Sequence, residues 1–116
     1  MKYILLMYAE PDAWPPDEHQ SAIAESVQLC NALDAAGQYI SAAPLQPAAT
    51  ARCVKVREGR TVVSDGPFPE TKEQLGGYFL IDVDNLDEAI AIAGRVLGSR
   101  RGTAEIRPLL EWPEDL

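Results

Sequence analysis

Apolar side chains occupy nearly every position in two short segments of the chain. In Lys2–Ala9, one set of apolar residues would point to each face of a sheet. Leu75–Val83 has the same doubly apolar pattern. Strands that are apolar on both sides are typical of the middle of a sheet that is covered on both faces. The pattern therefore predicts two central strands.

Two further segments have helical periodicity. Asp17–Ala36 places its apolar residues on one stripe, and Gly37 follows as a residue suited to end the helix in a left-handed conformation. The expected stripe consists of Ile23, Val27, Cys30 and Leu33. A second helix begins after Asn85, with Glu88 three residues on in the capping-box position. We expect its buried stripe to contain Leu86, Ile90, Ala93 and Leu97, with Gly98 closing the helix.

Four other segments have the composition of strands. Gln38–Leu45 follows the first helix, and Ala104–Leu110 lies near the end of the chain. Ala51–Arg57 and Thr61–Ser64 flank a short loop that contains a glycine, which is typical of a hairpin. Their alternation predicts a half-exposed ribbon. The residues expected on one face of the last strand are Ala104, Ile106 and Leu110.

The order of these elements is typical of one α+β domain that spans residues 1–116. It is a ferredoxin-like split βαβ pattern with an inserted hairpin. Two helices cover only one face of such a sheet, so the second apolar face of the central strands needs another cover. The simplest cover is a second copy packed sheet against sheet, which predicts a symmetric homodimer. The alternative is a monomer in which the loop around Trp14 folds over that face.

Composition narrows the possible functions. The chain has 10 Lys and Arg against 18 Asp and Glu, a formal charge of −8 that disfavours nucleic acid as a partner. Cys30 and Cys53 lie apart from each other and from the single histidine, so we expect free thiols, no metal and no cofactor. The apolar run Tyr3–Ala9 lacks the cleavage site of a leader, and nothing approaches the ~20 apolar residues of a membrane span. We expect a cytoplasmic protein.

The run Asp65–Tyr78, DGPFPETKEQLGGY, is the least ordinary part of the sequence. Pro67 and Pro69 restrict themselves and the residues before them, which predicts a stiff loop that displays polar side chains. Gly76 and Gly77 would let a backbone or a ligand approach the central strand closely. Such a frame suits a small-molecule pocket. The alternative is a proline-rich turn that only leads into a strand.

This run, with the opening MKYILLMYAE and the closing AEIRP, resembles the DGPF branch of the YciI-like, or YCII-related, proteins. The resemblance implies a ferredoxin-like fold that dimerises as an α+β barrel, with a cleft as a candidate active site. Some members of the wider family carry a His–Asp pair proposed to act in acid–base or hydrolytic chemistry. Asp65 matches the aspartate of the DGPF motif. The only histidine, His19, lies about two helical turns before the expected position near Ser26, on nearly the same helix face. The alternative, favoured by its neighbours Pro15, Pro16, Asp17 and Glu18, is a solvated residue at the start of the helix.

Asp65 and His19 are therefore the candidate catalytic residues of a metal-free site in the dimer cleft. Asp65 would act as a base near neutral pH only if burial or the nearby Glu70 raised its pKa. Other polar side chains are candidates for binding a small anionic ligand. They are Glu70, Lys72, Tyr78, Arg101 and Arg107. Each has an ordinary alternative role, as a solvated ion pair for the charged residues or as a core or interface residue for the tyrosine.

A non-catalytic accessory or regulatory module is the second hypothesis. Proteins similar to this branch are often encoded beside extracytoplasmic-function sigma factors, which implies a sigma-factor-linked protein partner. Oxygenase-like chemistry, as in related dimeric barrels, is a third option, for which the sequence holds no cofactor motif. The sequence leaves the choice between enzyme and module open and identifies no substrate.

Overall fold

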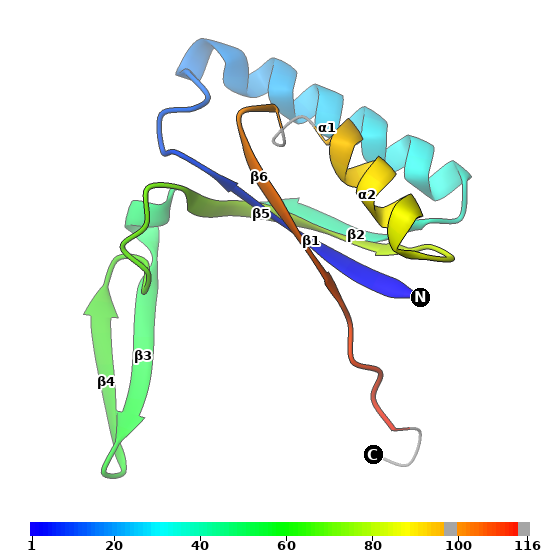
Figure 1. Ribbon diagram of the computed structural model, residues 1–116. Helices are drawn as coiled ribbons and strands as arrows, with labels where there is room; N and C mark the ends of the chain where they lie inside the picture. Colours follow the sequence, from blue (N-terminus) through cyan, green and yellow to red (C-terminus); the bar gives the residue numbers. More distant parts are fainter. Residues whose placement is uncertain (97–99, 114–116) are drawn as a thin grey trace.

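The computed structural model describes residues 1–96 and 100–113. Two helices lie over a four-stranded antiparallel sheet, and a two-stranded hairpin stands apart from it (Figure 1). The strands are β1 (Lys2–Ala9), β2 (Tyr39–Pro44), β3 (Arg52–Arg57), β4 (Arg60–Asp65), β5 (Gln74–Asp82) and β6 (Gly102–Pro108). The helices are α1 (His19–Ala35) and α2 (Leu86–Arg95), with short 3₁₀ turns at Pro16–Glu18 and Ala48–Thr50.

The sheet has the ferredoxin-like strand order β2-β5-β1-β6. Because β1 and β2 are each antiparallel to β5, they run parallel to each other with β5 inserted between them. This is the predicted split βαβ arrangement, with the β3–β4 hairpin inserted between β2 and β5. The α+β fold class is confirmed.

The hydrophobic core lies between the sheet and the helices. On β1, every second residue faces it, so that Tyr3, Leu5 and Met7 are buried. Phe79 and Ile81 do the same on β5. Full burial of a side chain such as Leu5 stabilises the fold by roughly 1.5–3 kcal/mol relative to exposure. The two central strands and the helices thus share one core cluster.

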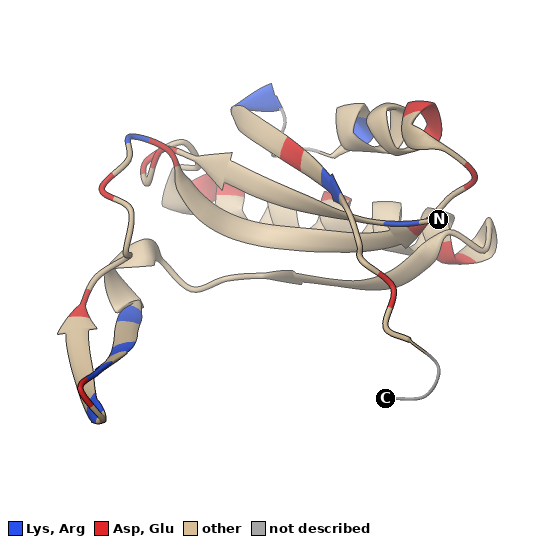
Figure 2. Cartoon of the chain, turned by 60° about the horizontal axis from the view of Figure 1, so that its bottom comes forward, with Lys and Arg blue, Asp and Glu red and all other residues tan. Residues whose placement is uncertain are grey.

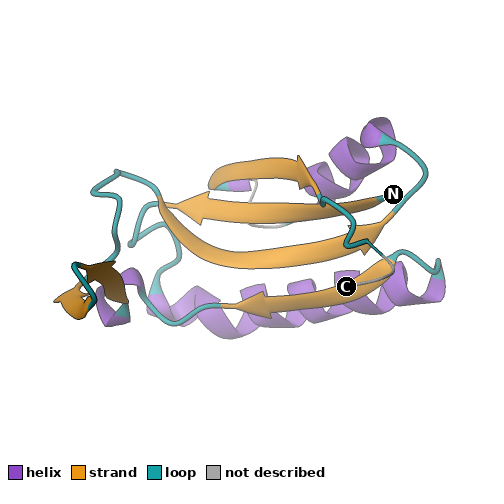
Figure 3. Cartoon of the chain, turned by 90° about the horizontal axis from the view of Figure 1, so that it is seen from below, coloured by secondary structure: helices purple, strands orange, loops and turns teal. Residues whose placement is uncertain are grey.

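The opposite side of the sheet is here called the open sheet face. It carries the alternate residues of each strand, which point away from the core. Its apolar residues on the central strands are half-buried: Ile4, Leu6, Tyr8, Tyr78 and Leu80. No helix or strand of the described residues lies against this face (Figure 3). Trp14, which the monomer alternative would place there, instead stacks on Arg101, whose guanidinium carbon is 4.1 Å from the ring centroid. Among residues 1–96 and 100–113, helices cover the central strands on one side of the sheet and leave the other side without a layer (Figure 3).

Helix α1 contacts the core along its C-terminal half. Leu33 is buried and Cys30 packs against the core cluster, but Ile23 and Val27 are more than half exposed. The predicted four-residue stripe is therefore wrong in its first half, because no residue of α1 before Leu29 belongs to the core cluster. Gly37 has the expected left-handed backbone, φ 73°, and closes the helix.

Helix α2 begins as predicted but faces the core with different residues. The Asn85 side-chain oxygen accepts a hydrogen bond from the Glu88 backbone N–H at 3.0 Å, and the Glu88 carboxylate accepts one from the Asp84 N–H. The buried stripe is Ala89, Ile92, Ala93 and Val96. Of the predicted stripe only Ala93 is buried, and Leu86 and Ile90 are about half exposed; small alanines on the buried side let the helix approach the sheet closely. Leu97 and Gly98 lie outside the described residues.

The hairpin Arg52–Asp65, here called the arm, extends from the side of the molecule that carries the open sheet face (Figures 1 and 3). Its four valines are each at least half exposed, so the prediction of a half-exposed ribbon is wrong. In the part of the chain that the structure describes, no second layer backs the ribbon. The arm makes the chain broad and flat, 48 × 47 × 19 Å, and its radius of gyration of 16.2 Å exceeds the roughly 13 Å of a compact domain of this length.

The two edge strands both end in proline. β2 ends at Pro44, and β6 ends at Pro108 rather than continuing to Leu110. The Leu109 N–H still donates to the carbonyl of Lys2 at 2.9 Å, but Leu110 is 95% exposed and is not on the inner face. Neither described helix combines the length and the apolar composition that crossing a bilayer requires.

Candidate functional site

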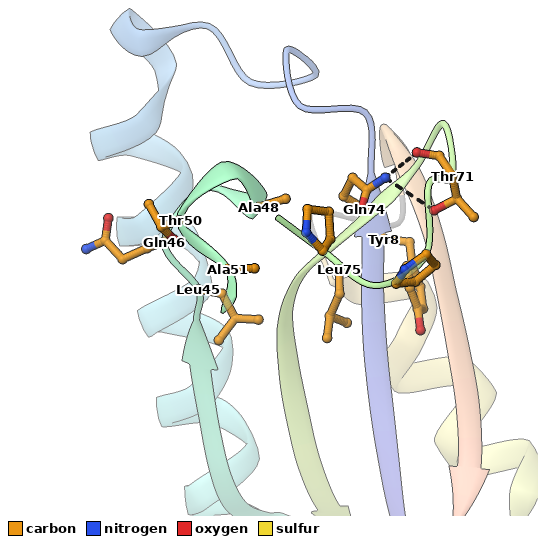
Figure 4. Close-up of a pocket in the computed structure, with 11 residues that line it drawn as sticks. Tyr8, Leu45, Gln46, Ala48, Thr50, Ala51, Thr71, Gln74 and Leu75 are labelled. Atoms are coloured by element: carbon orange, nitrogen blue, oxygen red, sulfur yellow. Dashed lines mark hydrogen bonds between the residues drawn. The ribbon is translucent and has the colours of Figure 1, made fainter. Parts of the chain in front are cut away.

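A pocket of about 410 Å³ lies where the arm joins the sheet. Its walls are the connection from β2 to β3, the loop after the arm, and the adjoining ends of β1 and β5. The lining residues are Tyr8, Leu45, Gln46, Ala48, Thr50, Ala51, Pro67, Pro69, Thr71, Gln74 and Leu75. In the view of Figure 4, Leu45 and Ala51 stand on one side and Tyr8 and Thr71 on the other. None of the lining side chains is charged, and we call this space the arm-root pocket.

The glycine pair brings the strands together below the pocket. The β1–β5 register passes from Met7 opposite Gly77 to Tyr8 opposite Leu75, so Gly76 is an extra residue, as in a β-bulge. A Cβ atom on Gly77 would lie 2.9 Å from the carbonyl oxygen of Ala43, which leaves no room for a side chain. The expected close approach is confirmed at Gly77, where the approaching group is the backbone of β2; at Gly76 a Cβ atom would make only an ordinary contact, 3.8 Å from the Met7 carbonyl oxygen.

The loop after the arm is fastened at both ends. Gly66, with φ 81°, donates its N–H to the carbonyl of Ala51 at 2.9 Å, and its own carbonyl accepts from the Cys53 thiol. Thr71 donates its hydroxyl to the Glu73 carbonyl at 2.6 Å, and the Gln74 side-chain amide donates to Thr71 (Figure 4). These bonds hold Pro67, Pro69 and Thr71 as one wall of the pocket.

A second hollow of similar volume adjoins the first on the β6 side. It shares Tyr8, Pro69 and Thr71 with the arm-root pocket. Its other lining residues are Glu73, Thr103 and Glu105. Because two of them are carboxylates, this hollow is acidic where the arm-root pocket is neutral. The loop after the arm therefore separates two spaces of different chemistry.

The structure places the two candidate catalytic residues in different parts of the molecule. Asp65 ends β4, its side chain is 89% exposed, and it forms an ion pair with Arg52 at 3.2 Å. His19 begins α1, and its Nε2 lies 2.6 Å from the carbonyl oxygen of Trp14, so Nε2 carries the proton in that hydrogen bond. Neither residue lines the two spaces described above.

Two candidate cations are engaged by carboxylates. Lys72 Nζ lies 3.2 Å from a Glu10 carboxylate oxygen. The Arg101 guanidinium donates to both oxygens of Glu18, at 2.6 and 3.1 Å, and also to a backbone carbonyl. This two-point bond lowers the pKa of Glu18 and raises that of Arg101. Arg101 thus fastens the start of β6 to the segment before α1.

The remaining predicted ligand-binding residues lie near the open sheet face or in the loop. Tyr78 shares a 2.6 Å hydrogen bond with Ser41 on the neighbouring strand. Arg107 stands opposite Ile4 in the register of β6 with β1, on the side of the open sheet face. Glu70 is exposed between two residues that line the arm-root pocket, Pro69 and Thr71. No two of these three are partners in a hydrogen bond or ion pair that brings them into one site.

Both cysteines are free. Burial raises the pKa of the Cys30 thiol, which packs against the core. Within residues 1–96 and 100–113, no three His, Cys, Asp or Glu side chains gather as a set of metal ligands.

The arm-root pocket contains residues that sequence reasoning missed. Tyr8, Gln46, Thr50 and Gln74 line it but are not among the candidate site residues that the sequence suggests. A signal was present, because each of the two segments that wall the pocket contains two prolines, in PLQPAAT and in GPFP. Proline pairs that stiffen two separate connections indicate two loops held in fixed positions.

Comparison with known proteins identifies the family. Residues 1–113 match the family described as the YCII-related domain, and the chain belongs to it. The chain is also similar to an uncharacterized protein of Rhizobium meliloti (strain 1021). The two are 35% identical over 114 residues, which cover 94% of this chain and 92% of that protein.

Proposed function

We propose that this YCII-related protein binds an uncharged small molecule in the arm-root pocket and does so as a homodimer. The observation that carries the proposal is the neutral lining of a space of about 410 Å³, within the usual size range of small-molecule sites. Leucine, alanine and proline side chains offer apolar contact. Tyr8 and the side-chain oxygen of Gln74 supply hydrogen-bonding groups at the pocket, because the Thr71 hydroxyl and the Gln74 side-chain nitrogen are already bonded within the loop.

The chemistry of the pocket favours a neutral ligand over the anionic one considered from the sequence. Lys72 is paired with Glu10 and Arg101 with Glu18, and neither cation lines the pocket. The adjoining hollow presents Glu73 and Glu105, which would repel an anion. A molecule with an amide or hydroxyl group on an apolar skeleton satisfies the hydroxyls and amides without bringing in a charge.

Acid–base or hydrolytic chemistry centred on Asp65 would require two changes at that residue. The carboxylate would have to leave Arg52 and be withdrawn from water, because an exposed, paired aspartate is a weak base near neutral pH. A second subunit or a partner seated against the arm could bury it. We therefore propose binding as the function that one chain supports, with Asp65 chemistry dependent on assembly.

The homodimer is supported by the open sheet face. Ile4, Leu6 and Leu80 are half-buried there, without a covering layer among the described elements. Covering them with an identical face removes apolar surface from water on both copies at once. Sedimentation at micromolar concentration is expected to give twice the 12.7 kDa chain mass. A particle of 12.7 kDa would overturn the homodimer.

Ligand-observed NMR tests the pocket with pairs of probes that share one skeleton. We expect primary amides such as benzamide to bind and the matching carboxylates, such as benzoate, to bind weakly or not at all. Ala48→Phe fills the pocket and is expected to abolish binding, whereas Ala49→Phe, at an exposed neighbour that does not line it, is the matched control. Equal binding to both variants, or a preference for carboxylates, would contradict the proposal.

A second candidate function is an accessory or regulatory module with a protein partner, including one linked to an extracytoplasmic-function sigma factor. The exposed pairs Ile23 with Val27 and Leu86 with Ile90 favour it, since each pair lies one turn apart on a helix surface. Co-expression with a candidate partner tests it. Recovery of that partner by the wild-type chain, and its loss with Ile23→Ser/Val27→Ser, is the expected result; equal recovery would exclude this surface.

A further inference from the structure

The arm has two unlike faces. In the β3–β4 register, Val54 stands opposite Val63 and Val56 opposite Thr61, so these four share one face, which we call the valine face. The other face places Lys55 opposite Val62 and Arg57 opposite Arg60. Lys55 there also lies 4.9 Å from the ring centroid of Phe68. The valine face also carries the paired Arg52 and Asp65, and the other three cations of the arm lie on the opposite face.

No other helix or strand of the described residues supports the valine face. Val54, Val56 and Val63 are 60 to 62% exposed, and neither β3 nor β4 joins the four-stranded sheet. An isolated two-stranded hairpin is marginally stable in water, and it needs a further layer to be stable independently. Three exposed valines on one side therefore mark the side on which that layer belongs.

The charge of the arm is opposite to that of the rest of the molecule. Residues 52–65 hold four Lys or Arg against two Asp or Glu, a net charge of +2. The remaining residues hold six against sixteen, a net charge of −10. In Figure 2 the cations of the arm lie along β3 and at the turn, and carboxylates are spread over the body of the chain. The arm is complementary in charge to the body of another copy of the same chain.

We propose that the arm is an intersubunit arm, which packs its valine face against the acidic body of a second copy. The arm extends on the side of the open sheet face, so a copy seated on that face lies alongside it (Figures 1 and 3). The contact removes the valines from water, and the net positive charge of the arm, although Lys55, Arg57 and Arg60 lie on its opposite face, adds long-range attraction to the acidic body. The proposal rests on the homodimer proposed above, and adds an element that face-to-face packing of the sheets does not require.

Contact of the arm with a second copy would also affect the arm-root pocket, because residues at the base of the arm line this pocket. Ala51 precedes β3 and Pro67 follows β4, and both line the arm-root pocket. The Gly66 N–H bonded to the Ala51 carbonyl closes the arm at the point where these walls begin. An arm held by a second copy fixes the distance between the two walls. Dimerisation is therefore expected to tighten binding of the neutral probes.

Matched substitutions on the two faces of the arm test the proposal by sedimentation equilibrium. Val54→Ser/Val63→Ser removes apolar surface from the valine face, and we expect the dimer to dissociate at least roughly tenfold more readily. Val62→Ser, on the other face of the same hairpin, is expected to leave the dimer nearly unchanged. Because none of these residues belongs to the core cluster, circular dichroism should show folded chains throughout. Equal dissociation constants for wild type and the double variant would overturn the arm's role.

Charge reversal provides an independent measurement. Lys55→Glu/Arg57→Glu/Arg60→Glu should weaken the dimer, and raising the salt concentration should weaken the wild type more than this variant. A labelled DNA duplex is the competing partner for a basic ribbon. Salt-sensitive binding of the duplex that is lost in the variant, with an unchanged dimer, would overturn the proposal.

The outcomes separate this proposal from the one on which it rests. If the protein is a dimer that binds benzamide, and Val54→Ser/Val63→Ser leaves its dissociation constant unchanged, the arm has no role in the dimer and the proposed function still holds. A 12.7 kDa particle would remove both the homodimer and the arm's role, while probe binding and its loss in Ala48→Phe would still report on the pocket. Photocrosslinking from position 56 is expected to give a species of twice the chain mass, with position 62 as the weaker control.

Discussion

In the four-stranded sheet, Leu5 and Ile81 alternate with half-exposed neighbours and are themselves fully buried. In the arm, Val54 and Val56 alternate with Lys55 and Arg57 in the same way, yet they are 61 and 62% exposed. The two regions have equally regular strands, and they differ in whether another layer of the same chain lies behind them. Alternation thus reports which side of a strand is apolar, and the layers of the fold decide whether that side is buried.

The largest expected effect on stability comes from truncating a buried side chain of the sheet, and the same kind of substitution in the arm is the comparison. Leu5→Ala removes a fully buried side chain and should lower the free energy of unfolding by about 2–5 kcal/mol. Val54→Ala on the arm should change it by less than roughly 0.5 kcal/mol when the chains are dilute enough to be separate. Urea denaturation measures both. Similar losses at the two positions would mean that the arm is part of the chain's own core.

Gly102 tests how closely the sheet is assembled at its edge. A Cβ atom on this residue would lie 1.9 Å from the carbonyl oxygen of Tyr8, so the β1–β6 pairing has to shift. We expect Gly102→Ala to destabilise the fold by about 1–3 kcal/mol, as overpacking does. Thermal unfolding followed by circular dichroism measures the loss. Unchanged stability would show that β6 pairs less closely than the register indicates.

The cap of α2 has a smaller effect, because it lies at the surface of the body. Asn85→Ala removes the acceptor for the Glu88 N–H and should lower stability by about 1 kcal/mol. Asn85→Asp keeps an acceptor oxygen and should retain most of the stability. Equal losses in the two variants would mean that the side-chain hydrogen bond contributes nothing.

Replacing a glycine in α2 by alanine is expected to change stability in the opposite direction to the same substitution at Gly102. A Cβ atom on Gly94 would meet nothing within 4 Å, and the residue lies within the helix. Gly94→Ala should therefore raise the free energy of unfolding by roughly 0.5–1 kcal/mol, because alanine restricts the unfolded chain and favours helix. The same urea titration measures it, and a loss of stability would contradict this reading of the helix surface.

The bond between Glu18 and Arg101 should make a small, pH-dependent contribution to the body. Arg101 lowers the pKa of Glu18 in the folded chain, so the contribution is present above the ordinary glutamate pKa and is lost as the pH falls through the lowered value. Glu18→Gln should thus be less stable than wild type near pH 7, by an amount that disappears in acid. A difference in melting temperature that is constant with pH would exclude the charge as its origin.

Much of the fold could be predicted from the sequence because its signals are local. Doubly apolar runs predict β1 and β5, the Asn85–Glu88 pair predicts the start of α2, and Gly37 predicts the end of α1. The buried side of α2 could not be predicted in this way. The stripe at Leu86 and the stripe at Ala89 are both apolar, and the sheet selects the one with smaller side chains.

The candidate site was less accessible to prediction, because it depends on contacts between distant segments. The proline-rich loop after Asp65 was identified as the feature that shapes a pocket, and Pro67, Pro69 and Thr71 do line one. The opposing wall comes from residues 45–51, which carry no charge or motif that would connect them with the loop. Asp65 itself belongs to the ribbon, since pairing with Arg52 extends β4 by one residue beyond the predicted end.

Pro44 and Pro108, which end the two outer strands of the sheet, limit the ways in which copies can associate. A proline presents no N–H to an incoming strand, and charged side chains such as Glu105 along such a rim further discourage strand addition. Growth of a continuous sheet from molecule to molecule is therefore disfavoured at both rims. Concentrated solutions should accordingly contain discrete particles of defined size, without the open-ended fibrils that unprotected strands can nucleate.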